Sequence, residues 1–251
     1  MSGHSKWSKI HRQKEVADAK RGQLFTKLGR AIAVAVRAGG GVTDPEANFQ
    51  LRLAIEKAKQ LNMPKANIER AIQRGTGKGE GSKLEQITYE GYGPGGIAVM
   101  VQTATNNKQR TGQEIKNLFE KGGGSLGGPG SVSFQFESMG LLVMEKPKNP
   151  EESLLKLIDL GAEDVDESED EIEVYVRPEK LEEMRQAIRQ EGYKLKNFEL
   201  TMKPKNIVAI KEKSQASKVL NFMNKLEDHD DVQKIFANFD IPDEIVNQLT
   251  S

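Results

Sequence analysis

Apolar residues in the first quarter of the chain recur at the spacing of an α-helix. With about 100° of rotation per residue, one face of a helix from residue 13 to residue 38 collects Leu24, Phe25, Leu28, Ile32, Ala35 and Val36. The opposite side collects the cations Lys20, Lys27, Arg30 and Arg37. Three consecutive glycines at positions 39–41 end the pattern. The sequence therefore predicts an amphipathic helix with an exposed basic face.

Two further helices are expected before residue 75. One begins at Thr43-Asp44-Pro45, where a capping side chain precedes a proline, and it ends near Asn62. Pro64 opens a third, shorter helix, and the glycine-rich stretch 75–81 is expected to be a linker. Residues 1–12 show no period and are interpreted as an arm. We therefore predict a basic arm and a three-helix domain over residues 1–78.

The pattern then changes to strands. Residues 87–90 and 97–103 predict the two strands of a hairpin. Thr111-Gly112-Gln113-Glu114 has the spacing of a capping box, which predicts a helix from that point. A glycine-rich loop at 122–130 leads into a predicted strand at 131–137.

Residues 140–200 have the element order of a separate unit. Their pattern predicts strand, helix, strand, strand, helix and strand, which is the ferredoxin-like order. A helix near 212–227 and a strand near 233–239 would complete the unit begun at residue 87. We therefore predict an α and α/β multidomain protein. Its parts are an N-terminal three-helix domain (1–78), an α/β middle domain (79–138 plus 203–251) and an acidic ferredoxin-like domain (139–202) inserted into the middle domain.

Charge is unevenly distributed along a chain whose 37 Lys or Arg balance 37 Asp or Glu. Residues 1–75 hold 15 basic against 6 acidic residues, whereas residues 140–200 hold 9 against 17. Such asymmetry indicates that the basic part meets a polyanion. The alternative is that the two regions attract each other within the molecule, although salt screens such attraction beyond about 8–10 Å.

Composition also excludes several classes of site. Cysteine is absent, which leaves no disulfide, no thiolate nucleophile and no cysteine zinc site. The first residues lack the apolar segment of a secretory signal, and the apolar run at 31–36 is far shorter than the roughly 20 residues of a membrane span. We expect a cytoplasmic protein with no membrane partner.

Basic residues in the arm and first helix are candidates for binding nucleic-acid phosphates, with affinity that falls as salt rises. These candidates, with one aromatic residue among them, are Lys6, Trp7, Lys9, Arg12, Lys14, Lys20, Arg21, Lys27, Arg30 and Arg37. Trp7 either stacks on a base or anchors the arm to the body. Lys108 and Arg110 form a second patch where a strand ends and a helix begins, a place that suits anions. The alternative is that the polar residues of this patch only cap the helix.

Several motifs match catalytic or cofactor patterns in the wrong structural context. Residues 91–96 fit G-x-G-x-x-G and residues 123–127 fit G-x-S-x-G, yet each leads into a predicted strand rather than a helix. Histidine occurs only as His4 and His11 in the arm and as His229. Residues 228–231 offer metal ligands but are interpreted as a solvated loop after a helix. We therefore expect no catalytic residue, no cofactor and no metal.

Six blocks together resemble the YebC/PmpR family over essentially the full length. They are GHSKW (3–7), AKRGQLFTKL (19–28), ANFQLRLAIEKAKQLNMP (47–64), YEGYGPGG (89–96), TNNKQRT (105–111) and GGGSLGGPGSVSFQF (122–136). This chain has Asn106 where the family's loop usually has an acid, and Gln109 where it usually has a second asparagine. The loop therefore carries one negative charge fewer than is usual in the family.

The resemblance implies three domains and a non-enzymatic role in gene expression. Bacterial members are described as DNA-binding transcriptional regulators, some resemble ribosome-associated translation factors, and mitochondrial relatives activate translation of cytochrome c oxidase subunit one. The expected partner is therefore nucleic acid, either DNA or ribosomal RNA, with the ribosome itself a candidate. The alternative from a different class is a protein-interaction module whose basic face pairs with an acidic protein.

Overall fold

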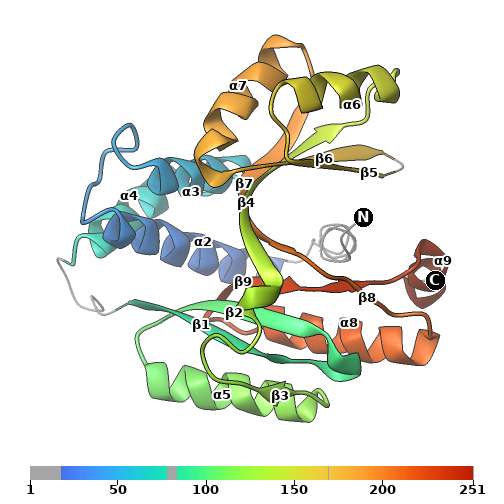
Figure 1. The fold of residues 1–251 in the computed structure, drawn as a ribbon. Helices are drawn as coiled ribbons and strands as arrows, with labels where there is room; N and C mark the ends of the chain where they lie inside the picture. Colours follow the sequence, from blue (N-terminus) through green and yellow to red (C-terminus); the bar gives the residue numbers. More distant parts are fainter. Residues whose placement is uncertain (1–17, 78–83, 169, 251) are drawn as a thin grey trace.

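The computed structural model describes residues 18–77, 84–168 and 170–250 (Figure 1). The predicted arm and most of the predicted linker lie outside these residues. The chain forms three packed parts: a helical part, a sheet covered by helices, and a second sheet that carries helices of its own (Figure 1). No helix in the described part of the chain is both long and apolar enough to cross a membrane.

The helical part contains α2 (Asp18–Ala38), α3 (Phe49–Gln60) and α4 (Lys65–Gly75). The apolar face predicted for α2 is confirmed, because its residues pack with those of α3 and α4 in one core. Gly75 lets α4 lie close to α2, since a Cβ at that position would come within 2.6 Å of the Val36 Cβ atom. The three predicted helices are therefore present.

The expected start of α3 is wrong by several residues. Asp44 Oδ1 accepts a hydrogen bond from the backbone N–H of Glu46 at 3.0 Å, which holds the Thr43-Asp44-Pro45 stretch in a turn. Asn48 provides the actual cap, because its Oδ1 accepts from the backbone N–H of Leu51 at 3.1 Å. Two capping side chains stand close together here, and the second one begins the helix.

The middle sheet has the strand order β3 (Ser125–Leu126), β1 (Glu85–Tyr92), β2 (Ala98–Thr105) and β9 (Val232–Ala237), with every pair antiparallel. The predicted hairpin is confirmed. Residues 91–96 are the end of β1 and the turn into β2, so they lead into a strand and are not a dinucleotide site. Helices α5 (Lys108–Lys121) and α8 (Lys213–Glu227) pack against this sheet (Figure 1). The rings of Phe119 in α5 and Phe222 in α8 meet edge to face at 5.1 Å.

Two boundaries around this sheet differ from the expectation. Helix α5 starts at Lys108 with Asn107 as its cap, so Thr111 lies inside the first turn and not at a capping box. The strand predicted at 131–137 begins only at Phe136, after a 3-10 turn. The cause is Glu90, a buried carboxylate that accepts backbone N–H bonds from Gly130, Val132 and Ser133 and so bends the segment.

The second sheet has the order β5 (Asp164–Glu167), β6 (Glu171–Val176), β4 (Phe136–Glu145) and β7 (Leu195–Pro204). Helices α6 (Pro150–Asp159) and α7 (Leu181–Gln190) complete the predicted β-α-β-β-α-β order. Long antiparallel pairing joins β4 to β7, from Phe136 opposite Pro204 to Met144 opposite Leu195. The chain thus leaves the middle part along β4 and returns along β7 (Figure 1).

The returning chain completes the middle part. It forms β8 (Val208–Ala209), α8, β9, β10 (Phe239–Asp240) and α9 (Asp243–Thr250). Strand β9 pairs with β2, and this pairing places the turn before β9 beside the end of β2. The N–H of Ala104 donates to the carbonyl of Asp231 at 2.8 Å there. This approach of residues over 120 positions apart positions the site described next.

Candidate nucleic-acid interface

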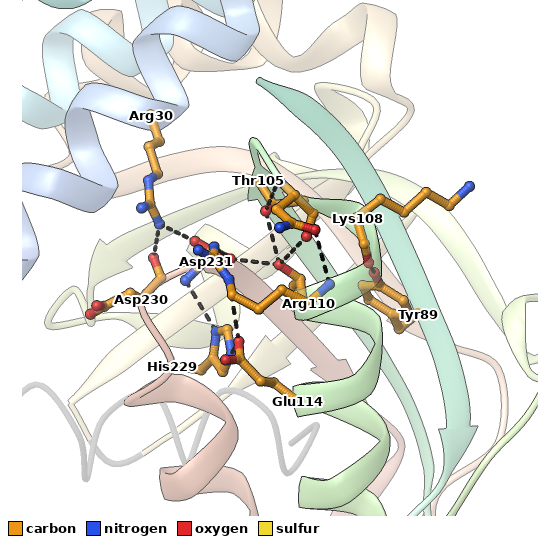
Figure 2. A network of polar contacts seen from close by, with 11 residues as sticks. Arg30, Tyr89, Thr105, Lys108, Arg110, Glu114, His229, Asp230 and Asp231 are labelled. Carbon is orange, nitrogen blue, oxygen red and sulfur yellow. Dashed lines mark hydrogen bonds and ion pairs between the residues drawn. The ribbon is translucent and has the colours of Figure 1, made fainter. Parts of the chain in front are cut away.

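The polar side of α2 faces the middle part of the protein instead of open solvent. The Lys27 ammonium donates to the carbonyl of Glu227, and the Arg37 guanidinium donates to the carbonyl of Leu84. Arg30 donates to the carbonyl of Asp230 and pairs with the carboxylate of Asp231 at 2.7 Å (Figure 2). The expectation of an exposed basic face is therefore wrong for Lys27, Arg30 and Arg37. Each is partly buried because another part of the chain supplies its hydrogen-bond acceptors.

Asp231 is the centre of this contact, and sequence reasoning missed it. Only 3% of its side chain is exposed, although residues 228–231 were expected to be a solvated loop. One carboxylate oxygen accepts from Arg30, and the other accepts from Arg110 at 2.7 Å and from the Thr111 hydroxyl at 2.6 Å (Figure 2). A single buried carboxylate thus joins α2, α5 and the turn before β9.

The ionisation of Asp231 follows from these contacts. Burial by itself raises the pKa of a carboxyl group, because it removes water from the charged form. At Asp231 the hydrogen bonds from Thr111 and Arg110 and the charge of Arg30 outweigh burial, so the pKa lies below its ordinary value. The opposite balance holds at Lys27, where burial outweighs the neighbouring acids and the pKa is lowered. The connection between α2 and the middle part therefore depends on a carboxylate that is ionised at neutral pH.

The second predicted patch lies at the start of α5. Asn107 caps the helix by accepting from the N–H of Arg110 at 3.1 Å, as the capping alternative required. The Arg110 side chain is 47% exposed and is shared between Asp231 and Glu114. Lys108 is exposed and points away from the Asp231 cluster (Figure 2). Of the two predicted cations, Lys108 is therefore the one that is directed toward solvent.

A groove of about 640 Å³ opens between the helical part and the end of the β1–β2 hairpin. Its cationic lining comes from Arg30 of α2 and from Arg70 and Arg74 of α4. Asn106 lines it from the hairpin side, beside the paired ends of β1 and β2. None of the described lining residues is acidic, and all of them come from the first 106 positions of the chain. The groove is therefore a concave, positively charged surface that the acidic part does not reach.

Arg70 and Arg74 were not among the sequence candidates, although both are exposed cations of α4. Their spacing of four residues is the signal that could have found them, because it puts both on one side of a helix. Arg70 donates to the side-chain oxygen of Asn67. The Arg74 guanidinium makes no hydrogen bond or ion pair with another residue in the described ranges, whereas its backbone carbonyl accepts from the N–H of Gly77.

The remaining sequence candidates fall outside what the structure describes. Lys6, Trp7, Lys9, Arg12 and Lys14 precede residue 18. The other two, Lys20 and Arg21, lie in the first turns of α2, but their side chains are not described. Of the predicted residues whose side chains are described, Arg30 and Arg110 meet on Asp231, and Lys27 lies near Arg30, whereas Lys108 points away from this cluster.

Two carboxylates and a histidine at this place also resemble a metal site. Ligand atoms of Glu114, His229 and Asp231 lie within 4.8 Å of one another. The guanidinium of Arg110 contacts two of these three carboxylate or imidazole groups, because it pairs with Asp231 and lies 3.7 Å from Glu114. A metal ion would have to displace this fixed positive charge. The three residues are therefore better explained as an ion-pair network than as a metal site.

Comparisons with known proteins cover almost the whole chain. A family model described as "TACO1/YebC protein N-terminal domain" matches residues 5–78, and one described as "TACO1/YebC second and third domain" matches residues 84–239. Proteins called probable transcriptional regulatory protein are similar over the full length. The one from Dictyoglomus turgidum is 50% identical and covers 100% of both chains, and the one from Moorella thermoacetica is 48% identical and covers 99% of both.

A solved structure shares the fold. The crystal structure of a conserved hypothetical protein from Aquifex aeolicus superposes with a TM-score of 0.80 and is 46% identical, covering 90% of this chain and 92% of its own. The prediction of an α and α/β multidomain architecture is confirmed by this likeness together with the two family models.

Proposed function

Because the chain belongs to the TACO1/YebC family, whose relatives are named as regulators of transcription, we propose that it is a nucleic-acid-binding regulator of gene expression that acts in the cytoplasm without catalysis. The observation that supports binding is the groove whose exposed cations are Arg70 and Arg74, with no acidic residue among the described residues that line it. Guanidinium groups bind phosphate oxygens through paired, charge-assisted hydrogen bonds.

The groove is also well placed for a longer contact. It adjoins α2, and the segment before α2 is basic in sequence, with Lys6, Lys9, Arg12 and Lys14. Lys108 adds an exposed cation two residues after Asn106, which lines the groove. We propose that these cations extend the contact along a nucleic-acid backbone, with Trp7 stacking on a base.

Two kinds of nucleic acid are candidates, each with an observation in its favour. The names of the relatives point to DNA and transcription. The concave shape of the groove points to irregular or unpaired RNA, and so to a translation factor that contacts ribosomal RNA, because sequence-specific RNA recognition mostly targets single-stranded regions.

A role without catalysis is supported by the state of the one histidine in the described ranges. The Nδ1 atom of His229 accepts from the backbone N–H of Asp231 at 3.1 Å, and Nε2 lies 3.0 Å from the Glu114 carboxylate. Both ring nitrogens are therefore engaged in structural contacts, which is unlike a general base directed at a substrate.

The experiment that tests the function is a side-by-side titration of the full chain against duplex DNA and purified ribosomal subunits, at low and near-physiological salt. Tight binding to a subunit at the higher salt, with weak and salt-sensitive DNA binding, would identify a translation factor. Tight binding to particular promoter duplexes, well above random DNA, would identify a transcriptional regulator. Binding to neither would refute the proposal and favour an acidic protein as the partner.

A further inference from the structure

The groove between α2, α4 and the β1–β2 hairpin has an apolar floor as well as a cationic rim. Phe25 and Met63 line it, and both also pack against the core of the helical part. The Phe25 ring is only partly buried, so part of its surface faces the groove. A cationic rim alone suits any phosphate, but an aromatic floor adds a surface on which a nucleobase can stack.

Two asparagine amides face the same groove from opposite parts of the protein. Asn67 belongs to α4, whereas Asn106 follows β2. The Asn67 side-chain oxygen accepts from Arg70, so its NH₂ group is turned the other way, as a donor. Asn106 is exposed and supplies a donor and an acceptor on a short side chain. Amides of this kind match the hydrogen-bonding edges of unpaired bases.

The size of the groove limits what enters it. Pockets of roughly 300–1,000 Å³ enclose single small organic ligands, and the volume here is about 640 Å³. This space is suited to one or two nucleotides. A base inside a duplex is stacked on both faces and cannot reach the Phe25 ring unless it leaves the stack.

We propose that this groove receives one or two unpaired nucleotides, with Arg70 and Arg74 on the phosphates, Phe25 against a base, and Asn67 and Asn106 at the base edges. This inference rests on the proposed function and narrows it to single-stranded or locally unpaired nucleic acid. The shared chemistry is that of a phosphodiester strand with exposed bases, and both RNA and DNA present it.

The test measures binding of the full chain to labelled octanucleotides by fluorescence anisotropy across a salt series. The probes are single-stranded RNA, single-stranded DNA, a duplex of the same sequence, and a DNA octamer with abasic sites at its central positions. The variants are Arg70→Gln with Arg74→Gln, and Phe25→Leu. The matched control is Lys59→Gln with Lys65→Gln, which removes two exposed cations of the same helical part that do not line the groove.

The inference predicts that the single strands bind at least ten-fold more tightly than the duplex and the abasic probe. The double arginine variant should lower the slope of log affinity against log salt by about 1.4, because each lost phosphate contact to a single strand contributes about 0.7. The control should leave both that slope and the preference for intact single strands over abasic ones unchanged, because its two lysines do not line the groove. Phe25→Leu should lose most of this preference. If that variant folds poorly, the comparison of intact with abasic probes on the wild-type chain still tests whether bases contribute to binding.

Other outcomes separate the two proposals. Equal binding of single strand, duplex and abasic probe, or binding that Arg70 and Arg74 do not affect, would overturn this inference and leave the proposed function standing. Binding of a polyglutamate peptide in preference to every oligonucleotide would overturn both. A preference between the RNA and DNA single strands would show which of the two sources the groove serves.

Discussion

Replacing Asp231 with asparagine should destabilise the protein through the contact between α2 and the middle part. Asparagine has nearly the same volume, so the substitution opens no cavity and removes mainly the charge. The carboxylate is 3% exposed and holds Arg30 at 2.7 Å and the Thr111 hydroxyl at 2.6 Å. Arg110 is exposed enough to turn to water, so the expected cost comes from the other two partners.

The magnitude follows from burial. Removing one partner of a fully buried ion pair costs about 3–5 kcal/mol, and the 25% exposure of the Arg30 side chain reduces this to roughly 2–3 kcal/mol. For a chain of this size that corresponds to a melting temperature lower by roughly 4–12 °C at pH 7. Calorimetry of the full chain measures it. Asp230→Asn is the matched control, because it removes the same charge from an exposed neighbour that contacts Arg30 only through its backbone carbonyl.

The same substitution should change how stability depends on pH. The lowered pKa of Asp231 means that its contribution is present above the ordinary carboxyl pKa of about 3.9 and is lost as the pH falls through the folded-state value. The difference between wild type and Asp231→Asn should therefore shrink as the pH is lowered below about 4. A melting temperature within 1 °C of wild type at pH 7, or a difference that does not shrink in acid, would refute the reasoning.

Two further substitutions test other parts of the fold. Glu90→Gln should lower the free energy of unfolding measured in urea by about 2–3 kcal/mol, because glutamine offers one acceptor atom to three backbone N–H groups. It should also speed amide exchange at Val132, and unchanged protection of Val132 would contradict this. Gly75→Ala should lower the melting temperature by pushing α4 away from α2, at a cost of about 1–3 kcal/mol, despite the better helix propensity of alanine. Gly22→Ala, whose added Cβ has nothing within 4 Å, should raise stability by up to about 1 kcal/mol, and equal melting temperatures for the two variants would show that the packing argument is wrong.

The sequence by itself determined the elements and their order. The apolar period of α2, the two strand segments of the hairpin and the order of elements in residues 140–200 all predicted what the structure contains. These patterns are reliable because burial of one face imposes a period that the local sequence must follow. The starts of α3 and α5 were missed because neighbouring Asp, Asn and Thr side chains compete to cap the same helix, and only the backbone geometry shows which one succeeds.

The tertiary structure alone decided which charges face solvent. The period of α2 showed that Lys27, Arg30 and Arg37 share its polar side, but a polar side meets either water or the acceptors of another part of the chain. Here carbonyl groups and the buried Asp231 take these cations, while Arg70 and Arg74 of α4 remain at the groove. The groove itself joins positions 22–74 to positions 84 and 106, which meet only when the hairpin packs beside the helices. Periodicity is a local property of the chain, whereas pairing of charges and the shape of a groove depend on distances between residues far apart in sequence.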